Sequence, residues 1–88
     1  MKDRTFTLLE KFVSTLNVEG VCGFWVDEEK DENELYWVYM IIDLDWLEEF
    51  TSKPEFVVHR MKIGLREEIK KWLGINVMVG SAVKKCFE

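Results

Sequence analysis

The chain has 88 residues with a formal net charge of −5, and 48% of its residues are hydrophobic. A chain of this length forms one domain, so we expect a single unit over residues 1–88 whose modest core depends on large aromatic side chains. The sequence lacks the run of about 18 apolar residues that a membrane-spanning helix needs. Since the start shows no signal-peptide pattern, we expect a cytoplasmic protein in which Cys22 and Cys86 are reduced thiols, unless the first and last strands bring them within bonding distance.

The first half of the chain predicts one helix and two strands. A helix over 5–16, capped by Asp3 or Thr5, would carry its apolar side chains on one stripe at helical spacing. Apolar runs at 20–26 and 35–42 predict two strands. The acidic run at 27–34 separates them, which predicts a hairpin with a long polar loop.

The second half predicts two helices and a last strand. Asp45 and Ser52 each begin a capping-box pattern, which predicts a short helical turn at 46–50 and a long helix at 53–73. Gly74 suits the end of the long helix, and alternating apolar residues predict a strand over 75–83. The long helix is expected to place one apolar face against the sheet, formed by Val57 or Val58, Met61, Leu65, Ile69, Trp72 and Leu73.

This αββ(α)αβ order predicts an α+β fold, a small two-layer sandwich with a three-stranded sheet. We expect the third strand to lie beside the first, although a place beside the second is also open. Strand 35–42 is apolar on both alternating faces, with Trp37 and Tyr39 on one and Tyr36 and Val38 on the other. Either one helix covers each face, or both helices pack on one face and leave the other for a partner.

The charge is unevenly distributed along the chain. Residues 1–54 carry five Lys/Arg and thirteen Asp/Glu, a net −8, whereas residues 55–88 carry seven and four, a net +3. We therefore predict a non-enzymatic protein–protein interaction module: a homodimer, or an inhibitor or subunit that docks on a basic protein surface, as small phage-encoded inhibitors do. The predicted interface combines the sheet face and the acidic run, through Trp25, Tyr36, Trp37, Tyr39, Glu28, Glu29, Asp31 and Glu32.

An enzyme is the alternative. Asp43, Asp45 and Glu48 follow a strand end and supply the oxygen ligands that Mg²⁺ or Mn²⁺ prefers, as a metal-dependent phosphodiesterase or nuclease would need. A simpler interpretation is that Asp43 ends the strand and Asp45 caps the next turn. The sequence contains no phosphate loop, dinucleotide fingerprint, zinc spacing or catalytic triad signature, so we expect no cofactor.

A second alternative is nucleic-acid binding through a basic stripe on the long helix, formed by His59, Lys62, Arg66 and Lys70. The string Gly20-Val21-Cys22-Gly23 matches G-x-x-G, and the element order is similar to the prokaryotic arrangement of KH domains, whose G-x-x-G loop clamps nucleotides. That loop lies between two helices, where this chain has a connection at 49–54 without glycine. A KH-like RNA- or DNA-binding module is therefore kept only as an alternative, since the chain as a whole is acidic.

Overall fold

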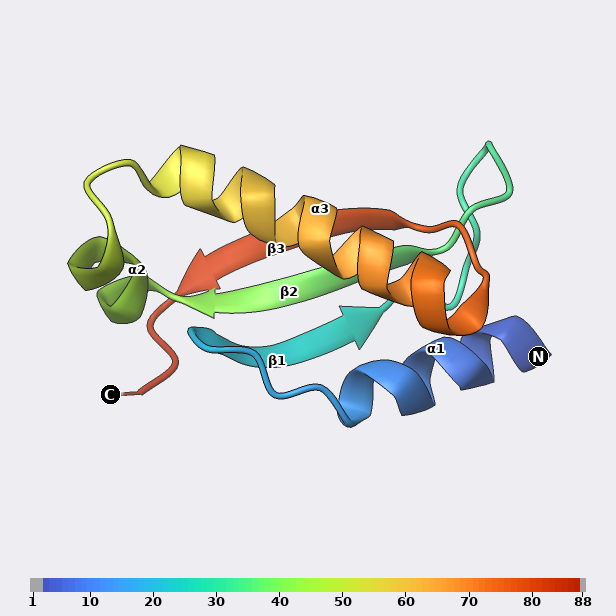
Figure 1. The fold of residues 1–88 in the computed structure, drawn as a ribbon. Helices are drawn as coiled ribbons and strands as arrows, with labels where there is room; N and C mark the ends of the chain where they lie inside the picture. The colour runs from blue at the N-terminus through green and yellow to red at the C-terminus, as the bar shows by residue number, and fades with distance from the viewer. Residues whose placement is uncertain (1–2, 88) are drawn as a thin grey trace.

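A computed structural model describes residues 3–87, and within them the helices and strands follow one another in the predicted order (Figure 1). The elements are α1 (Arg4–Ser14), β1 (Val21–Val26), β2 (Trp37–Asp43), α2 (Leu44–Phe50), α3 (Pro54–Leu73) and β3 (Met78–Lys84). The predicted α+β fold and its element order are confirmed. None of the described helices combines the length and the apolar character that crossing a membrane requires.

The helix ends show which capping signals operate. The Asp3 carboxylate accepts a hydrogen bond of 2.9 Å from Phe6 N and caps α1, as predicted. Helix α2 begins after Asp43, whose carboxylate accepts from Trp46 N at 3.1 Å, so the predicted cap at Asp45 is wrong. The predicted cap at Ser52 is also wrong, because α3 begins at Pro54 after Lys53 and has no side-chain cap. Pro54 needs no cap for its own nitrogen, which lacks a proton.

The sheet order is β1-β2-β3, with β2 in the middle. Strand β1 pairs antiparallel with β2, and β3 pairs parallel with β2 over Trp37↔Met78 to Asp43↔Lys84. The expectation that the third strand lies beside the first is therefore wrong. The central place goes to the strand that is apolar on both faces, where both of its backbone edges are paired and its side chains are best removed from water.

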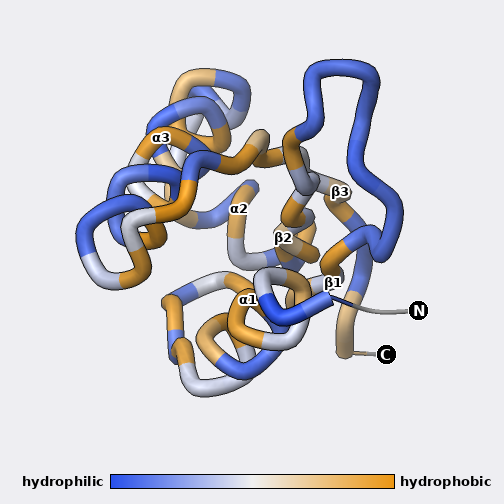
Figure 2. The backbone as a smooth tube through the Cα atoms, turned by 90° about the vertical axis from the view of Figure 1, so that its right-hand side faces the viewer, coloured by the Kyte–Doolittle hydropathy of each residue, from blue (hydrophilic) through white to orange (hydrophobic). Residues whose placement is uncertain are grey.

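Both long helices lie on one face of the sheet (Figure 2). That face presents Val38, Met40 and Ile42 of β2, all at most 1% exposed. Phe6, Leu9 and Val13 of α1 and Leu65 and Ile69 of α3 join them in one buried cluster. The structure thus decides between the two predicted arrangements: the helices do not sandwich the sheet, and the odd-numbered side chains of β2 lie on a face that neither helix covers.

One residue of the predicted helix face lies elsewhere. Trp72 is 62% exposed, and its indole N–H donates a hydrogen bond of 2.8 Å to the Glu68 carboxylate one turn earlier on α3. The predicted burial of Trp72 is wrong because this side chain has a polar partner on its own helix and lies near the helix end, where the sheet no longer covers it.

The two cysteines form a disulfide bond between β1 and the segment after β3. Their Cα atoms lie 6.4 Å apart, within the range that the bridge allows. The chain reaches this position by crossing the end of β2, where Cys86 N donates to the Asp43 carboxylate at 3.1 Å. The expectation of two reduced thiols is therefore wrong for this structure. Cys22 is exposed at a register shift in β1.

Candidate functional site

Three aromatic rings pack in a row across the uncovered face of the sheet, with Tyr39 tilted against Trp25 and stacked on Trp37. The Trp25 and Tyr39 ring centroids are 5.2 Å apart, and those of Trp37 and Tyr39 are 5.8 Å apart. The contact follows from the register, since Trp25 lies opposite Tyr39 on the neighbouring strand and Trp37 precedes Tyr39 by two residues on the same face. Ile41 and Met78 share this side of the sheet by alternation and register. We call the five residues Trp25, Trp37, Tyr39, Ile41 and Met78 the aromatic face.

The middle ring of the stack lies close against β3. Gly80 pairs with Tyr39, and a Cβ atom at Gly80 would come within 2.7 Å of two Tyr39 ring carbons. Such a distance is shorter than van der Waals contact, so only glycine leaves room for the ring here. The absence of a side chain at Gly80 thus helps to fix where the Tyr39 ring lies on the aromatic face.

The acidic loop, residues 27–34, joins β1 to β2 and rises from the end of the sheet on the side away from the helices (Figure 2). Asp31 organises it: one carboxylate oxygen accepts from Asn33 N and Leu35 N at 2.8 and 3.0 Å, and the other accepts from the Trp37 indole N–H at 2.9 Å. These hydrogen bonds lower the pKa of Asp31, and the bond from Leu35 N has the largest effect. Partial desolvation acts in the opposite direction but does not cancel them. Of the predicted loop residues, Asp31 holds the loop together, whereas Glu28, Glu29 and Glu32 are exposed.

Tyr36 is not on the aromatic face. It is 5% exposed on the helix-covered side, where its ring stacks on Phe6 with centroids 6.0 Å apart. Its hydroxyl hydrogen-bonds the Asp3 carboxylate, which raises the pKa of Tyr36 to about 12 and lowers the pKa of Asp3. Lys30 from the acidic loop lies 5.3 Å above the same ring and 3.9 Å from the Asp3 carboxylate. Tyr36 therefore joins α1 to the loop and contributes no ring to the exposed stack.

The carboxylates predicted as metal ligands do not converge. Both Asp43 oxygens accept backbone N–H groups, one from Trp46 and one from Cys86, and Asp43 is only 8% exposed. Asp45 and Glu48 are exposed on α2. Within residues 3–87 no group of three or more His, Cys, Asp or Glu side chains is placed to hold a metal ion. Asp43 caps a helix and anchors the chain after β3, and a phosphodiesterase activity finds no support in this arrangement.

The basic stripe does come together, along the outer edge of β3. His59, Lys62 and Arg66 line a hollow of about 180 Å³ with Ile63, Met78 and Val79. Arg66 and Lys70 line the next hollow, of about 420 Å³, together with Glu67 and residues 76–78. The stripe therefore borders a groove between α3 and β3, which the helical spacing alone could not indicate.

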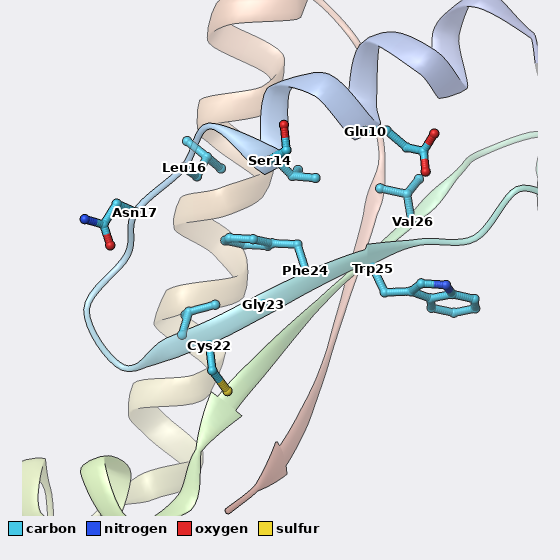
Figure 3. Close-up of a pocket in the computed structure, with 11 residues that line it drawn as sticks. Glu10, Ser14, Leu16, Asn17, Cys22, Gly23, Phe24, Trp25 and Val26 are labelled. Carbon is cyan, nitrogen blue, oxygen red and sulfur yellow. The ribbon is translucent and has the colours of Figure 1, made fainter. Parts of the chain in front are cut away.

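A second groove lies on the opposite edge of the sheet, between β1 and the end of α1 (Figure 3). Its volume is about 500 Å³, and Glu10, Ser14 and Asn17 form its polar side. Phe24 and Trp25 leave β1 in opposite directions in this view, Phe24 toward the helices and Trp25 toward the aromatic face. The groove thus follows the strand edge and touches the aromatic face only at Trp25.

Sequence reasoning found the three rings but missed residues that complete the surface. Ile41 belongs to the predicted strand 35–42, which is apolar on both faces. Met78 and Gly80 join the face only because β3 lies beside β2. The register Asp43↔Lys84 also places Lys84 at the end of the sheet opposite the acidic loop. Comparison with protein-family models, with curated proteins and with solved structures gave no match, so these contacts are the basis for any functional argument.

Proposed function

We propose that this protein acts by protein–protein association and that its partner is a second copy of the same chain, bound through the aromatic face. One observation supports this above all: both long helices pack on one side of the sheet, while three aromatic rings in mutual contact remain on the other, with Trp25 56% exposed. Exposed aromatic clusters of this kind are typical of interfaces, where Trp and Tyr are enriched.

The sheet face alone is too small for a stable dimer interface, so segments beside the three rings must also contribute. Strands of six or seven residues, three abreast, give the sheet a plan area of only about 300 Å² at about 3.3 Å per residue and 4.8 Å between strands. A stable interface buries about 800 Å² on each partner. The segments that flank the aromatic face, the acidic loop at one end and the chain after β3 at the other, are therefore included in the proposed interface.

The charges of these flanking segments favour one orientation. Glu28, Glu29 and Glu32 lie in the loop at the start of β2, and Lys84 and Lys85 lie at the end of β3, which runs parallel to β2. A two-fold axis perpendicular to the strands lays the two sheets face to face with their strands antiparallel. Each acidic loop then meets the lysines of the other copy, whereas an axis along the strands would bring the two acidic loops together.

The test is the mass of the protein in solution over a range from about 1 µM to about 500 µM, the range in which weak dimers dissociate. Sedimentation velocity should show a concentration-dependent dimer that Trp25→Ser converts to monomer. Trp72→Ser is the matched control, since Trp72 is similarly exposed (62%) but lies on α3, away from the aromatic face. A wild-type protein that stays monomeric over the whole range, or a Trp72 variant that dissociates as readily as the Trp25 variant, contradicts the proposal.

A further inference from the structure

The groove between α3 and β3 combines positive charge with an unpaired strand edge. Among the described residues, β3 has β2 as its only strand neighbour. Met78 N donates to Tyr36 O at 2.9 Å, so in this parallel pair Met78, Gly80 and Ala82 direct their backbone groups toward β2. The N–H and C=O groups of the intervening Val79, Ser81 and Val83 therefore face outward, in the regular spacing that another strand can pair with.

The charged side chains lie along the same edge. His59, Lys62 and Arg66 border the groove beside Met78 and Val79, and Lys70 continues the stripe toward residues 76–78. Glu67 is the one carboxylate that lines either hollow. An occupant of the groove would thus meet backbone donors and acceptors on the β3 side and a row of basic side chains on the α3 side.

We propose that this groove binds an extended acidic peptide segment of another protein, which adds to β3 as a fourth strand. Backbone pairing with Val79 and Ser81 supplies much of the affinity, as in other cases of strand addition. In an added strand, every second side chain points toward α3. The basic stripe favours a segment in which these side chains are carboxylates. Apart from Met78, which borders both, the groove and the aromatic face share no residue, and the peptide proposal is tested with variants that leave the three rings unchanged.

The observations favour a peptide over a nucleic-acid strand. A phosphate backbone offers acceptors only, so it would leave the outward C=O groups of β3 without partners. The two hollows contain no Trp, Tyr or Phe side chain on which a base could stack.

The other edge of the sheet is a poorer site for strand addition. Strand β1 has a register shift between Val21 and Gly23, and Cys22 at this shift is bonded to Cys86. Irregularities of this kind protect sheet edges from further pairing. The groove beside β1 is lined by a single charged side chain, Glu10, so it offers no comparable charge selection.

The experiment uses a fluorescently labelled, end-capped peptide of four Glu-Val repeats, titrated with the full-length protein and followed by anisotropy. We expect saturable binding that weakens as salt is added. The double variant Lys62→Glu, Arg66→Glu should weaken binding about tenfold or more. The matched control Arg60→Glu, Lys71→Glu changes the charge equally at exposed positions of α3 that do not line the groove, and it should bind like the wild type.

Further probes test the wild-type protein directly, so the proposal does not depend on any variant folding. The same peptide with alternate residues N-methylated loses the donors that strand pairing needs, and it should not bind. A peptide of four Lys-Val repeats should not bind either. Equal binding of the methylated peptide, no binding of the Glu-Val peptide, or binding of an oligodeoxythymidine in its place overturns the proposal, the last result in favour of nucleic-acid recognition.

Discussion

The indole N–H of Trp37 donates a hydrogen bond of 2.9 Å to the Asp31 carboxylate, and this bond connects the aromatic face to the acidic loop. The other oxygen of the same carboxylate holds the loop backbone at Asn33 and Leu35. One side chain thus fixes both the fold of the loop and the position of a ring. A change in the conformation of the acidic loop would therefore also move the Trp37 ring on the aromatic face.

Replacing Asp31 tests this coupling. Asp31→Asn keeps an acceptor for the loop but presents an amide N–H₂ where Trp37 needs an acceptor, so we expect a lower melting temperature and weaker dimer formation. The measurements are thermal unfolding and sedimentation velocity, with the indole N–H resonance of Trp37 as a local probe. Glu32→Gln is the control, since it removes the same charge from an exposed loop position. Equal effects of the two variants would show that charge alone matters.

Two carboxylates should make the fold sensitive to acid. The pKa of Asp3 is lowered mainly by its hydrogen bond to Tyr36, and that of Asp31 mainly by the bond from Leu35 N, from a usual value of 3.8 for each. Because the folded state holds these groups ionised, their stabilisation is present above pH 3.8 and is lost as the pH falls through the lowered values. Thermal unfolding between pH 7 and pH 2 should show the loss below about pH 4. A melting temperature that stays constant in this range would contradict the assignment.

The same hydrogen bond between Asp3 and Tyr36 also predicts a loss of stability at high pH. Since the pKa of Tyr36 is raised from 10.0 to about 12, its contribution is complete below pH 10 and disappears as the pH rises through 12. Phenolate absorbance should therefore show that one of the two tyrosines titrates late, together with the onset of unfolding. In Tyr36→Phe that late titration should be absent.

Gly80 should tolerate no side chain. The Cβ of Gly80→Ala would come within 2.7 Å of the Tyr39 ring, so we expect the variant to be less stable by about 1–3 kcal/mol, with the ring displaced from the stack. Gly64→Ala on α3 is the control, because a Cβ there meets nothing within 4 Å beyond its chain neighbours and the backbone of its own helix, and alanine favours helix. Gly64→Ala should raise stability by up to about 1 kcal/mol in urea unfolding. A Gly80 variant as stable as the wild type would mean that the ring moves without penalty.

The disulfide should account for a large part of the stability. It joins residues 64 positions apart, and the chain-entropy model assigns about 4 kcal/mol to closing a loop of this length. Urea unfolding of the oxidised protein and of Cys22→Ser, Cys86→Ser should differ by about that amount. Wild-type protein kept reduced should resemble the double variant. A difference well below 1 kcal/mol would indicate that the segment after β3 is held without the bond.

The proposed dimer orientation can be tested by charge reversal. Glu28→Lys, Glu29→Lys in one chain and Lys84→Glu, Lys85→Glu in another should each prevent homodimer formation, because like charges then face each other. Mixed together, the two chains should form a heterodimer, since each loop then meets a segment of opposite charge in the antiparallel arrangement. Native mass spectrometry of the mixture distinguishes these species. Homodimers of either variant as strong as the wild type would exclude this orientation.

Much of the fold followed from local signals. The stripe of Phe6, Leu9 and Val13 predicted α1, and the alternation of β2 placed Val38 and Met40 on the face opposite Trp37 and Tyr39. Such periodicities depend only on the backbone repeat of each element, so the sequence carries them directly. The helix caps were less certain because several residues in one connection, such as Asp43 and Asp45, satisfy the same pattern.

The parts that could not be predicted depend on distant contacts. The sequence shows that β2 has two apolar faces. The face that α3 covers depends on how the chain crosses over from β2 through α3 to β3. The place of β3 beside β2 then brings Met78 and Gly80 to the aromatic face and Cys86 to Cys22. The groove beside the basic stripe has the same origin, since His59 and Val79 become neighbours only in the folded chain.

The covalent bond between Cys22 and Cys86 closes a ring that contains all three strands in whole or in part and leaves α1 outside it. The exposed loop around Glu28 and Glu29 lies within this ring. A protease that cuts there would open the ring without separating its pieces, so the nicked molecule would migrate as one band until a reductant is added. Cleavage at this exposed loop would thus leave both parts of the sheet joined through the disulfide.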